Sequence, residues 1–370
     1  MKRKLMILGV LMIFLISCSP KKNVDSNHSK KVEDNEEIVE EVEEKVHYYS
    51  PYRGEDVEES DLTKPAYAIM LDNHPDARPQ AGISEADILY EMKVEGDFTR
   101  YFAVFQQNYP DPVGPIRSAR PYFVEEALGL GSIYVHWGGS EAGYQEIRGT
   151  KIPNIDGIAW EGTTFYRNKE VNKLKPHNGY SNFSLFEEKA KELGYELDKT
   201  HQGFTFDHSE DLGEVQGEMG DQICEKAILT FAPTYKVEVE YDSNSQGYHL
   251  IRDGEEVIDE NNKEVCQFKN IILRVIPSRV AGPLGTLAMD NIGTGEGFYL
   301  SSGKIIPIIW SKDSKDSPMK YSTEEGQEII FNPGKTYIAT VNTMGDLDFY
   351  PQENHEEVEE NTTDMTEENN

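Results

Sequence analysis

Short apolar runs alternate with helix-like segments between residues 62 and 225. Apolar runs bounded by polar residues or glycine predict strands at 66–71, 88–95, 100–106 and 133–136. Helices are expected at 121–128, 141–147 and 185–193. Ser118 is a candidate N-cap for the first helix, and Ser184 with Glu187 forms a candidate capping box for the last. Strands that alternate with helices predict an α+β or α/β domain.

The chain from 226 to 342 follows a different pattern, in which apolar and polar residues alternate at period two. The alternation is clearest at 237–242 and 248–252, and further candidate strands lie at 271–276, 297–300, 305–310 and 336–341. Gly, Pro, Asn and Asp separate these segments, as is typical of turns between strands. This region therefore predicts a second, mostly antiparallel β domain.

The two ends of the chain lack a core pattern. Residues 18–61 are low in aromatics and rich in Glu, Lys, Asp and Asn, and residues 343–370 are acidic. Segments of this composition do not bury enough apolar surface to offset the entropy of ordering. We predict an acidic disordered tether at 18–61 and an acidic disordered tail at 343–370. The folded domains would then span 62–225 and 226–342.

The N-terminus has the layout of a bacterial lipoprotein signal. Three cations at positions 2–4 precede a short apolar stretch that ends at Ser17-Cys18. This stretch is too short to span a membrane comfortably as a permanent helix. Residues 1–17 are therefore predicted to be a signal peptide, and a lipid on Cys18 would anchor the protein at the extracytoplasmic face of the cell membrane. The alternative is an ordinary secretory signal, or an N-terminal anchor, with a chance cysteine.

The formal net charge of the 370-residue chain is −31. A chain this acidic is repelled by nucleic acid, so we expect no nucleic-acid partner. Cys224 and Cys266 could form a disulfide outside the cytoplasm, but the sequence does not distinguish a bridge from two buried thiols. No CxxC or HExxH spacing of the kind found in metal sites is present, and no cofactor is expected.

Polar residues and glycines follow two of the predicted strands: Asp72, Asn73 and His74 come after the first, and His136, Gly138, Gly139 and Ser140 stand at the end of a later one. In open α/β sheets, ligands gather at the carboxyl ends of strands. These residues are therefore candidates for substrate binding. The alternative at the later strand is a tight turn whose serine caps the next helix.

The predicted strand at 88–95 carries two candidate acids, Glu91 and Glu95. They share one face with Lys93, because alternate residues of a strand point the same way. Three charges on one face are typical of a solvated sheet surface. Glu95, however, stands at the strand end before a glycine, where a catalytic carboxylate fits. Glu95, Glu91 and Asp72 are the candidate catalytic residues.

Arg117 and Arg120 flank Ser118 just before the predicted helix at 121–128. Helix N-termini favour anions, and an arginine can bind a carboxylate or a phosphate through two parallel hydrogen bonds. The segment therefore predicts an anion-binding site. The alternative is that both arginines pair with nearby acids such as Glu125 and Glu126.

A third candidate histidine, His177, lies before Asn178, and both are assigned to substrate binding. With His74, His136 and Asp72, His177 could also form a metal site. The spacing of these residues is irregular and specifies no such site, so no bound metal is predicted.

Longer motifs stand out between residues 62 and 341: Asp72-Asn73-His74-Pro75, Ala77-Arg78-Pro79-Gln80, Glu95-Gly96, Thr99-Arg100, Gly114-Pro115-Ile116-Arg117-Ser118-Ala119-Arg120-Pro121, Val135-His136, Gly138-Gly139-Ser140, Pro176-His177-Asn178 and Asn332-Pro333-Gly334-Lys335-Thr336. Together they resemble the YerB-like lipoproteins of Gram-positive bacteria. The resemblance adds Arg78 and Arg100 to the candidate binding residues. It implies a membrane-anchored protein of two domains, and no reaction, since the family's function is uncharacterised. Asp97, Trp137 and Tyr337 depart from the family pattern without removing a candidate residue.

Two classes of function fit these residues. The leading hypothesis is an enzyme that cleaves cell-wall glycan, such as a lytic transglycosylase, with Glu95 as its single acid and Arg117 or Arg120 holding a substrate carboxylate. The alternative is a non-catalytic lipoprotein that binds a wall polymer, a peptide, another anionic ligand or an envelope protein. A metal-dependent hydrolase is a third hypothesis.

Overall fold

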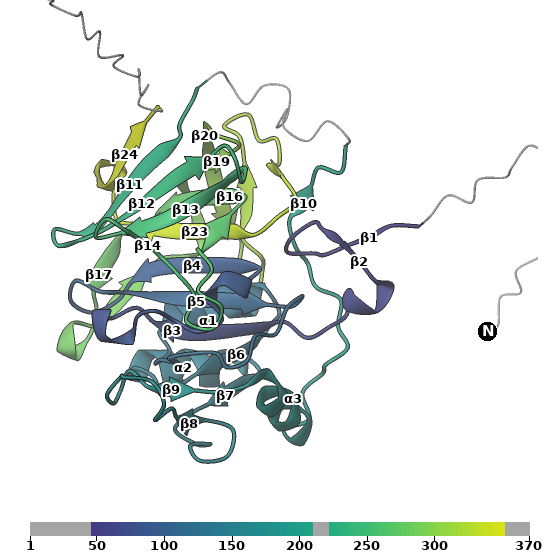
Figure 1. Ribbon diagram of the computed structural model, residues 1–370, viewed down its shortest axis with the longest axis vertical. Coiled ribbons are helices and arrows are strands. Elements are labelled where there is room, and N and C mark those ends of the chain that lie inside the picture. Colours follow the sequence, from purple (N-terminus) through teal and green to yellow (C-terminus); the bar gives the residue numbers. More distant parts are fainter. Residues whose placement is uncertain (1–45, 210–221, 352–370) are drawn as a thin grey trace, which may run out of the picture. The chain divides into compact units, whose positions relative to one another are not determined.

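A computed structural model describes residues 46–209 and 222–351 of the chain (Figure 1). The predicted signal peptide, Cys18, and most of the predicted tether and tail lie outside these residues. The chain from His47 onward belongs to one compact unit. Within the part of the chain that the structure describes, no helix is both long enough and apolar enough to cross a membrane.

Both predicted domains contribute strands to one ten-stranded sheet, in the order β21-β20-β19-β16-β23-β4-β5-β3-β6-β7 (Figure 1). The first region supplies β3 (Tyr67–Asp72), β4 (Ile88–Lys93), β5 (Thr99–Phe105), β6 (Ile133–His136) and β7 (Asn154–Asp156). The second region supplies β16 (Asn270–Val275), β19 (Gly293–Ser301), β20 (Lys304–Lys312), β21 (Lys320–Ser322) and β23 (Thr336–Val341). The two halves join where β23 pairs in parallel with β4, with Ile338 opposite Tyr90. The two regions therefore share a continuous hydrogen-bonded sheet.

A second sheet is antiparallel throughout and comes from the second region and the following residues. Its strands are β11 (Lys226–Ala232), β12 (Tyr235–Asp242), β13 (Gly247–Arg252), β14 (Glu255–Glu256), β15 (Gln267–Phe268) and β24 (Leu347–Tyr350). The second region is thus mostly antiparallel, as its alternating pattern predicts. The exceptions are the parallel pairings of β23 with β16 and β4 and of β22 with β10.

Several short elements complete the described chain. The short strands are β1 (Tyr48–Tyr49), β2 (Asp56–Val57), β8 (Tyr166–Arg167), β9 (Gly179–Tyr180), β10 (Thr205–Phe206), β17 (Ser278–Val280), β18 (Leu287–Met289) and β22 (Ile330–Phe331). The 3-10 turns are η1 (Glu59–Asp61), η2 (Pro75–Ala77), η3 (Ile83–Glu85), η4 (Pro283–Gly285) and η5 (Met344–Asp346).

The three predicted helices are present as α1 (Pro121–Gly129), α2 (Glu141–Thr150) and α3 (Phe183–Glu192). Two predicted caps are wrong. Helix α1 begins after Arg120, and the Ser118 hydroxyl instead donates to the carbonyl of Trp137. Helix α3 begins at Phe183, one residue before Ser184, so the predicted capping box is absent. At α2 the cap is as predicted, because Ser140 Oγ accepts from the Gly143 amide at 3.0 Å.

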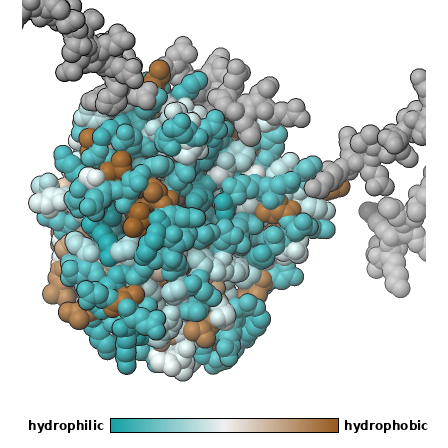
Figure 2. All heavy atoms as spheres, viewed as in Figure 1, coloured by the Kyte–Doolittle hydropathy of each residue, from teal (hydrophilic) through white to brown (hydrophobic). Residues whose placement is uncertain are grey.

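The large sheet is buried on both faces, which explains the continuous apolar runs of its central strands. Tyr67, Ile69 and Leu71 of β3 belong to a hydrophobic cluster that also contains buried residues of β11, β12 and β13. Ala68 and Met70 belong to a second cluster, with the buried side chains of α1. The two faces of β3 therefore contribute to two separate cores. On the face shown in Figure 2, exposed apolar residues are scattered among hydrophilic ones.

The predicted tether and tail are shorter than the sequence suggests. Tyr52 is fully buried within the predicted tether, and its hydroxyl donates to the Leu130 carbonyl at 2.8 Å. Residues 48–61 also form β1, β2 and η1. In the predicted tail, Leu347 of β24 pairs with Leu229 of β11. These segments are ordered because a few apolar side chains in an acidic context still reach the core.

Cys224 and Cys266 are buried free thiols. Burial raises the pKa of Cys224 to about 11 and that of Cys266 to about 12. Both therefore remain protonated and inert as nucleophiles at neutral pH. Of the two alternatives left open by the sequence, the structure has the buried thiols.

Candidate functional site

The candidate residues of the first region converge on one edge of the ten-stranded sheet. β3 and β6 are parallel neighbours, and each ends in a candidate residue, Asp72 and His136. β4 runs antiparallel to β5, as β3 does, so the chain after β4 brings Glu95 to the same edge. Arg100 lies directly opposite Asp72 on β5. This is the edge at which ligands gather in many α/β sheets.

Asp72 is the centre of a group that we call the rim cluster: Asp72, His74, Asp76, Arg117 and His177. Its Oδ2 atom lies 2.7 Å from His177 Nδ1 and 3.1 Å from Arg117 Nε. Its Oδ1 atom accepts from the His74 amide at 3.1 Å. The side chain of Asp72 is only 5% exposed, whereas those of Arg117 and His74 are 25% and 32% exposed. The carboxylate at the centre of the cluster is therefore buried, while Arg117 and His74 remain accessible to solvent.

Backbone pairing positions Arg117 and His177 beside Asp72. The Asp72 amide donates to the Pro115 carbonyl at 2.8 Å, and the Arg117 amide donates to the Met70 carbonyl at 2.9 Å. The Ile116 amide then donates to Gly179 at 2.7 Å, which brings the 177–179 segment alongside. Three segments far apart in sequence thus meet at the end of β3.

Three arginines form a second group, the arginine cluster: Arg100, Arg117 and Arg120. Burial and the neighbouring Arg120 and Arg117 lower the pKa of Arg100 to about 10, which marks a locally positive potential. Arg100 Nη1 donates to the Ser118 carbonyl at 2.5 Å. Arg120 binds Glu95 through two hydrogen bonds of 2.6 Å each. Arg120 therefore uses both sides of its guanidinium group to bind Glu95, whereas Arg100 and Arg117 have fewer hydrogen-bond partners.

Glu95 is a carboxylate at neutral pH. Burial acts to raise its pKa, but the hydrogen bonds and charge of Arg120 outweigh burial, and the pKa is lowered. A bidentate arginine stabilises the ionised form and leaves no proton to donate. In this arrangement Glu95 does not have the property that a general acid needs.

Glu91 lies in neither cluster, because it is fully buried between the two sheets. Its Oε1 atom accepts from Thr99 Oγ1, Asn73 Nδ2 and the Tyr235 hydroxyl at 2.6, 3.0 and 2.8 Å. Its Oε2 atom accepts from the Tyr337 hydroxyl at 2.7 Å and lies 3.6 Å from Arg252. We call this the inter-sheet network: Asn73, Glu91, Thr99, Tyr235, Arg252 and Tyr337. The solvated sheet surface expected from three charges on one face is therefore wrong for Glu91.

The tyrosines of the inter-sheet network act as donors. Burial, followed by the negative charge of Glu91, raises the pKa of both Tyr235 and Tyr337. Each hydroxyl thus keeps its proton and donates to Glu91. Arg78 and Gln80 extend the network, because both donate to Asn73 Oδ1, at 3.3 and 3.1 Å.

His136 has local partners that separate it from the rim cluster. It is fully buried, with Nδ1 2.8 Å from the Gly138 carbonyl and Nε2 3.3 Å from Asn154 Oδ1. Gly138 has a φ of +76°, a left-handed conformation that suits glycine, and its amide donates to Asp156. Gly139 forms a bridge with Ala119. The segment after β6 is thus a tight turn whose serine caps α2, which is the alternative that the sequence left open.

Asn178 donates weakly to the Asn168 carbonyl, at 3.4 Å. Its Oδ1 atom is buried and has no partner within residues 46–209 and 222–351. A buried amide oxygen without a partner leaves one acceptor unused beside His177.

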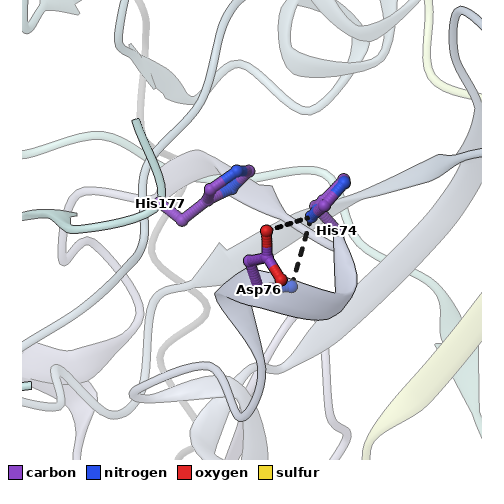
Figure 3. A group of neighbouring side chains, drawn as sticks. All are labelled: His74, Asp76 and His177. Atoms are coloured by element: carbon purple, nitrogen blue, oxygen red, sulfur yellow. Dashed lines mark hydrogen bonds and ion pairs between the residues drawn. The ribbon is translucent and has the colours of Figure 1, made fainter. Parts of the chain in front are cut away.

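Sequence reasoning did not make candidates of five members of these groups: Asp76, Thr99, Tyr235, Arg252 and Tyr337. Thr99 and Tyr337 entered only through the family pattern. Tyr235 and Arg252 come from the second region and carry no local motif. Asp76 follows His74 by two residues, in η2, and was not singled out. The only signal for Asp76 was its place in the polar stretch after β3. His74, Asp76 and His177 bring possible metal-ligand atoms within 4.8 Å of one another (Figure 3).

Comparisons with known proteins place the chain in a family. The model named Protein of unknown function (DUF3048) N-terminal domain matches residues 53–196, and its C-terminal counterpart matches residues 227–338. The chain is also 30% identical to "Putative lipoprotein YerB" of Bacillus subtilis (strain 168) over 305 residues, which are 81% of this chain and 87% of that protein. The chain belongs to the DUF3048 family. The resemblance to YerB-like lipoproteins is thus confirmed.

A crystal structure of YerB from Bacillus subtilis also has this fold. It aligns with a TM-score of 0.74 and 26% identity, and covers 82% of this chain and 99% of the YerB chain. The two DUF3048 models cover the two regions that the sequence separates, and the second of them spans the mostly antiparallel part. The family description assigns no reaction to either domain.

Proposed function

We propose that this DUF3048 protein is a lipoprotein anchored through Cys18 at the extracytoplasmic face of the cell membrane. We further propose that it binds a carboxylate- or phosphate-bearing polymer of the cell wall at the rim and arginine clusters. The N-terminal signal pattern supports the anchor, as does the name of the Bacillus subtilis relative. Glycan with its stem-peptide carboxylates is the leading ligand, because it is the abundant polymer within reach of such an anchor.

The observation that carries the binding proposal is the spare capacity of Arg117. Its Nε atom lies 3.1 Å from Asp72 Oδ2 in an ion pair but forms no hydrogen bond within residues 46–209 and 222–351, and the side chain is 25% exposed. An exposed guanidinium fork next to two other arginines suits a bidentate anion. The cluster is also unusual in a chain with a net charge of −31.

Cleavage of glycan by Glu95 is the less favoured function. A lytic transglycosylase needs a protonated acid at the glycosidic oxygen, whereas Arg120 holds Glu95 as a carboxylate. Glu91 is buried beyond the reach of a polymer, and Asp72 faces both Arg117 and His177. The three candidate acids thus have partners that stabilise their charge, which favours recognition over acid catalysis.

The experiment is sedimentation of the full-length chain, purified in detergent, with isolated sacculi. Wild type and Arg279→Ala should co-sediment with the sacculi, while Arg117→Ala should lose most of the binding. Arg279 is the matched control because it is an exposed arginine of β17 that pairs with Asp290. Bound protein should also be released by added salt, since exposed charges are screened.

Two results would contradict the proposal. Equal binding by Arg117→Ala and wild type would exclude the rim as the binding site, and absence of wild-type binding would exclude the wall polymer.

Mass spectrometry of the same samples tests cleavage. Anhydro-muramyl ends that disappear with Glu95→Gln would establish a lyase in place of a binding protein.

A further inference from the structure

His74, Asp76 and His177 form a compact group of potential metal ligands at the rim (Figure 3). One ligand atom from each lies within 4.8 Å of the other two. His74 and Asp76 belong to the turn after β3, and His177 reaches them from the segment before β9. The imidazole rings of His74 and His177 are stacked, with centroids 4.6 Å apart and planes at 23°, so one ring must turn before both lone pairs can point at one ion. Two histidines and one carboxylate are thus brought together from distant parts of the chain.

Asp72 positions the ring of His177 in the manner of an outer-shell ligand. Its Oδ2 atom lies 2.7 Å from His177 Nδ1, and both side chains are largely buried, at 5% and 13% exposure. A neutral imidazole that donates from Nδ1 keeps its lone pair on Nε2. A carboxylate bound to the remote nitrogen of a histidine is the usual support of a metal-ligating imidazole. Asp72 therefore leaves Nε2 of His177 available for a metal.

His74 has its lone pair on the side that faces Asp76. Its Nδ1 atom accepts a hydrogen bond from the Asp76 amide at 3.2 Å, so this nitrogen carries a lone pair, which an ion would have to take over from the amide. The same Nδ1 atom lies 3.6 Å from Asp76 Oδ2. Bonds of about 2.0–2.2 Å to a shared ion would place these two atoms roughly 3.3–3.6 Å apart in a tetrahedral site. The pair already has nearly this separation.

Small side-chain movements would complete the site. The greatest separation, up to 4.8 Å, must close to that of ligands on a common ion. Asp76 is 71% exposed, whereas His74 is 32% exposed and its ring also packs against Phe98, with centroids 4.7 Å apart. His177 is the fixed member, because Asp72 holds it. The ion would thus bind by drawing the exposed Asp76 and a reoriented His74 ring toward His177, which is positioned in advance.

We propose that His74, Asp76 and His177 bind one divalent transition-metal ion of the zinc type, with Asp72 as the positioning residue. Two imidazoles and one carboxylate suit zinc and its neighbours better than calcium or magnesium, which prefer oxygen ligands alone. Three protein ligands leave a fourth position open to water or to an anionic ligand. The main opposing charge, Arg117, is already paired with Asp72 at 3.1 Å. This inference does not depend on wall binding, and it revises the expectation that no metal binds.

The test is calorimetric titration of the full-length chain with Zn²⁺, together with visible absorption spectra of the Co²⁺-substituted protein. Wild type should bind one ion at a saturable site, and Co²⁺ should give absorption bands of a low-coordinate site. Asp76→Asn and His177→Gln should each weaken the affinity at least tenfold. Asp72→Asn should weaken it about 10–100-fold, as outer-shell substitutions do.

His249→Gln is the matched control, because His249 pairs with Glu256 on the second sheet and belongs to neither cluster. It should bind Zn²⁺ as wild type does. Asp76→Asn is the decisive variant, since its exposed side chain makes loss of fold a poor explanation, and circular dichroism would verify this. Absence of a saturable site in wild type would overturn the proposal, as would wild-type affinity in both Asp76→Asn and His177→Gln.

Discussion

The inter-sheet network and the rim cluster each combine a carboxylate with arginine, yet they differ in what surrounds them. Glu91 is fully buried, and both of its oxygens are occupied by donors from the two DUF3048 regions. Asp72 is also buried, but its partners Arg117 and His177 reach solvent. A buried, closed network specifies how two regions pack, whereas an open one keeps donors for a ligand. The difference implies that substitutions in the first cost stability and those in the second cost binding.

Glu91→Ala should have the largest effect on stability. It removes the acceptor of four hydrogen bonds and leaves Arg252 as a buried cation without its carboxylate. Breaking a buried charged group in this way costs about 3–5 kcal/mol. Urea denaturation would measure this loss. Glu141→Ala is the control, since its exposed pair with Arg148 should contribute within about 1 kcal/mol. Equal losses of unfolding free energy in the two variants would contradict the structural role that we assign to the inter-sheet network.

Tyr337→Phe should have the next largest effect, about 1–3 kcal/mol, because Glu91 Oε2 loses its hydrogen bond while the ring remains. Tyr67→Phe is the matched control. Tyr67 is equally buried, but its hydroxyl has no partner in the described part of the chain, so its removal should cost little. Thermal unfolding of the two variants would compare them directly. A Tyr67→Phe loss as large as that of Tyr337→Phe would contradict this assignment.

Much of the fold could be predicted from local pattern, and the joining of its two regions could not. The apolar run of β3 and the three helices depend on neighbours in sequence. The bond between Tyr337 and Glu91 links residues 246 positions apart, and no local signal marks it. The same limit applies to the parallel pairing of β23 with β4, which makes one sheet of two predicted domains.

The candidate site shows a similar division. Strand ends made Asp72 a candidate, an arginine-rich segment before a helix made Arg117 one, and His177 was a separate candidate, whereas only the structure brings the three side chains together. The sequence did not show that Arg120 binds Glu95, because the pair depends on how β4 and the segment before α1 meet. The sequence can therefore predict an acid at a strand end, but the ionisation of that acid depends on a partner that is distant in sequence.

Glu95→Gln should have a smaller effect that depends on pH. The folded protein lowers the pKa of Glu95 below its ordinary value of 4.5, so the ion pair stabilises the fold fully above that value. This contribution is lost as the pH falls through the lowered pKa. At pH 7 the substitution should cost no more than about 1 kcal/mol, since the pair is partly solvated. The denaturation curves of wild type and Glu95→Gln should therefore differ at pH 7 and converge in the acid range. A cost that grows as the pH falls would contradict the ionised state.

Arg117→Ala should have the smallest effect on stability, below about 1 kcal/mol. Asp72 would still have His177 and the His74 amide as partners, and Arg117 itself is partly exposed. The midpoint of urea denaturation should barely move. A loss as large as that predicted for Glu91→Ala would mean that the rim is structural after all.

The most direct test of the account compares Arg117→Ala with Tyr337→Phe in sedimentation with sacculi, below the unfolding range of both. Arg117→Ala should remain as stable as wild type and lose wall binding, while Tyr337→Phe should be less stable and bind as wild type does. Wall binding that persists in Arg117→Ala and disappears in folded Tyr337→Phe would contradict the assignment of recognition to the rim.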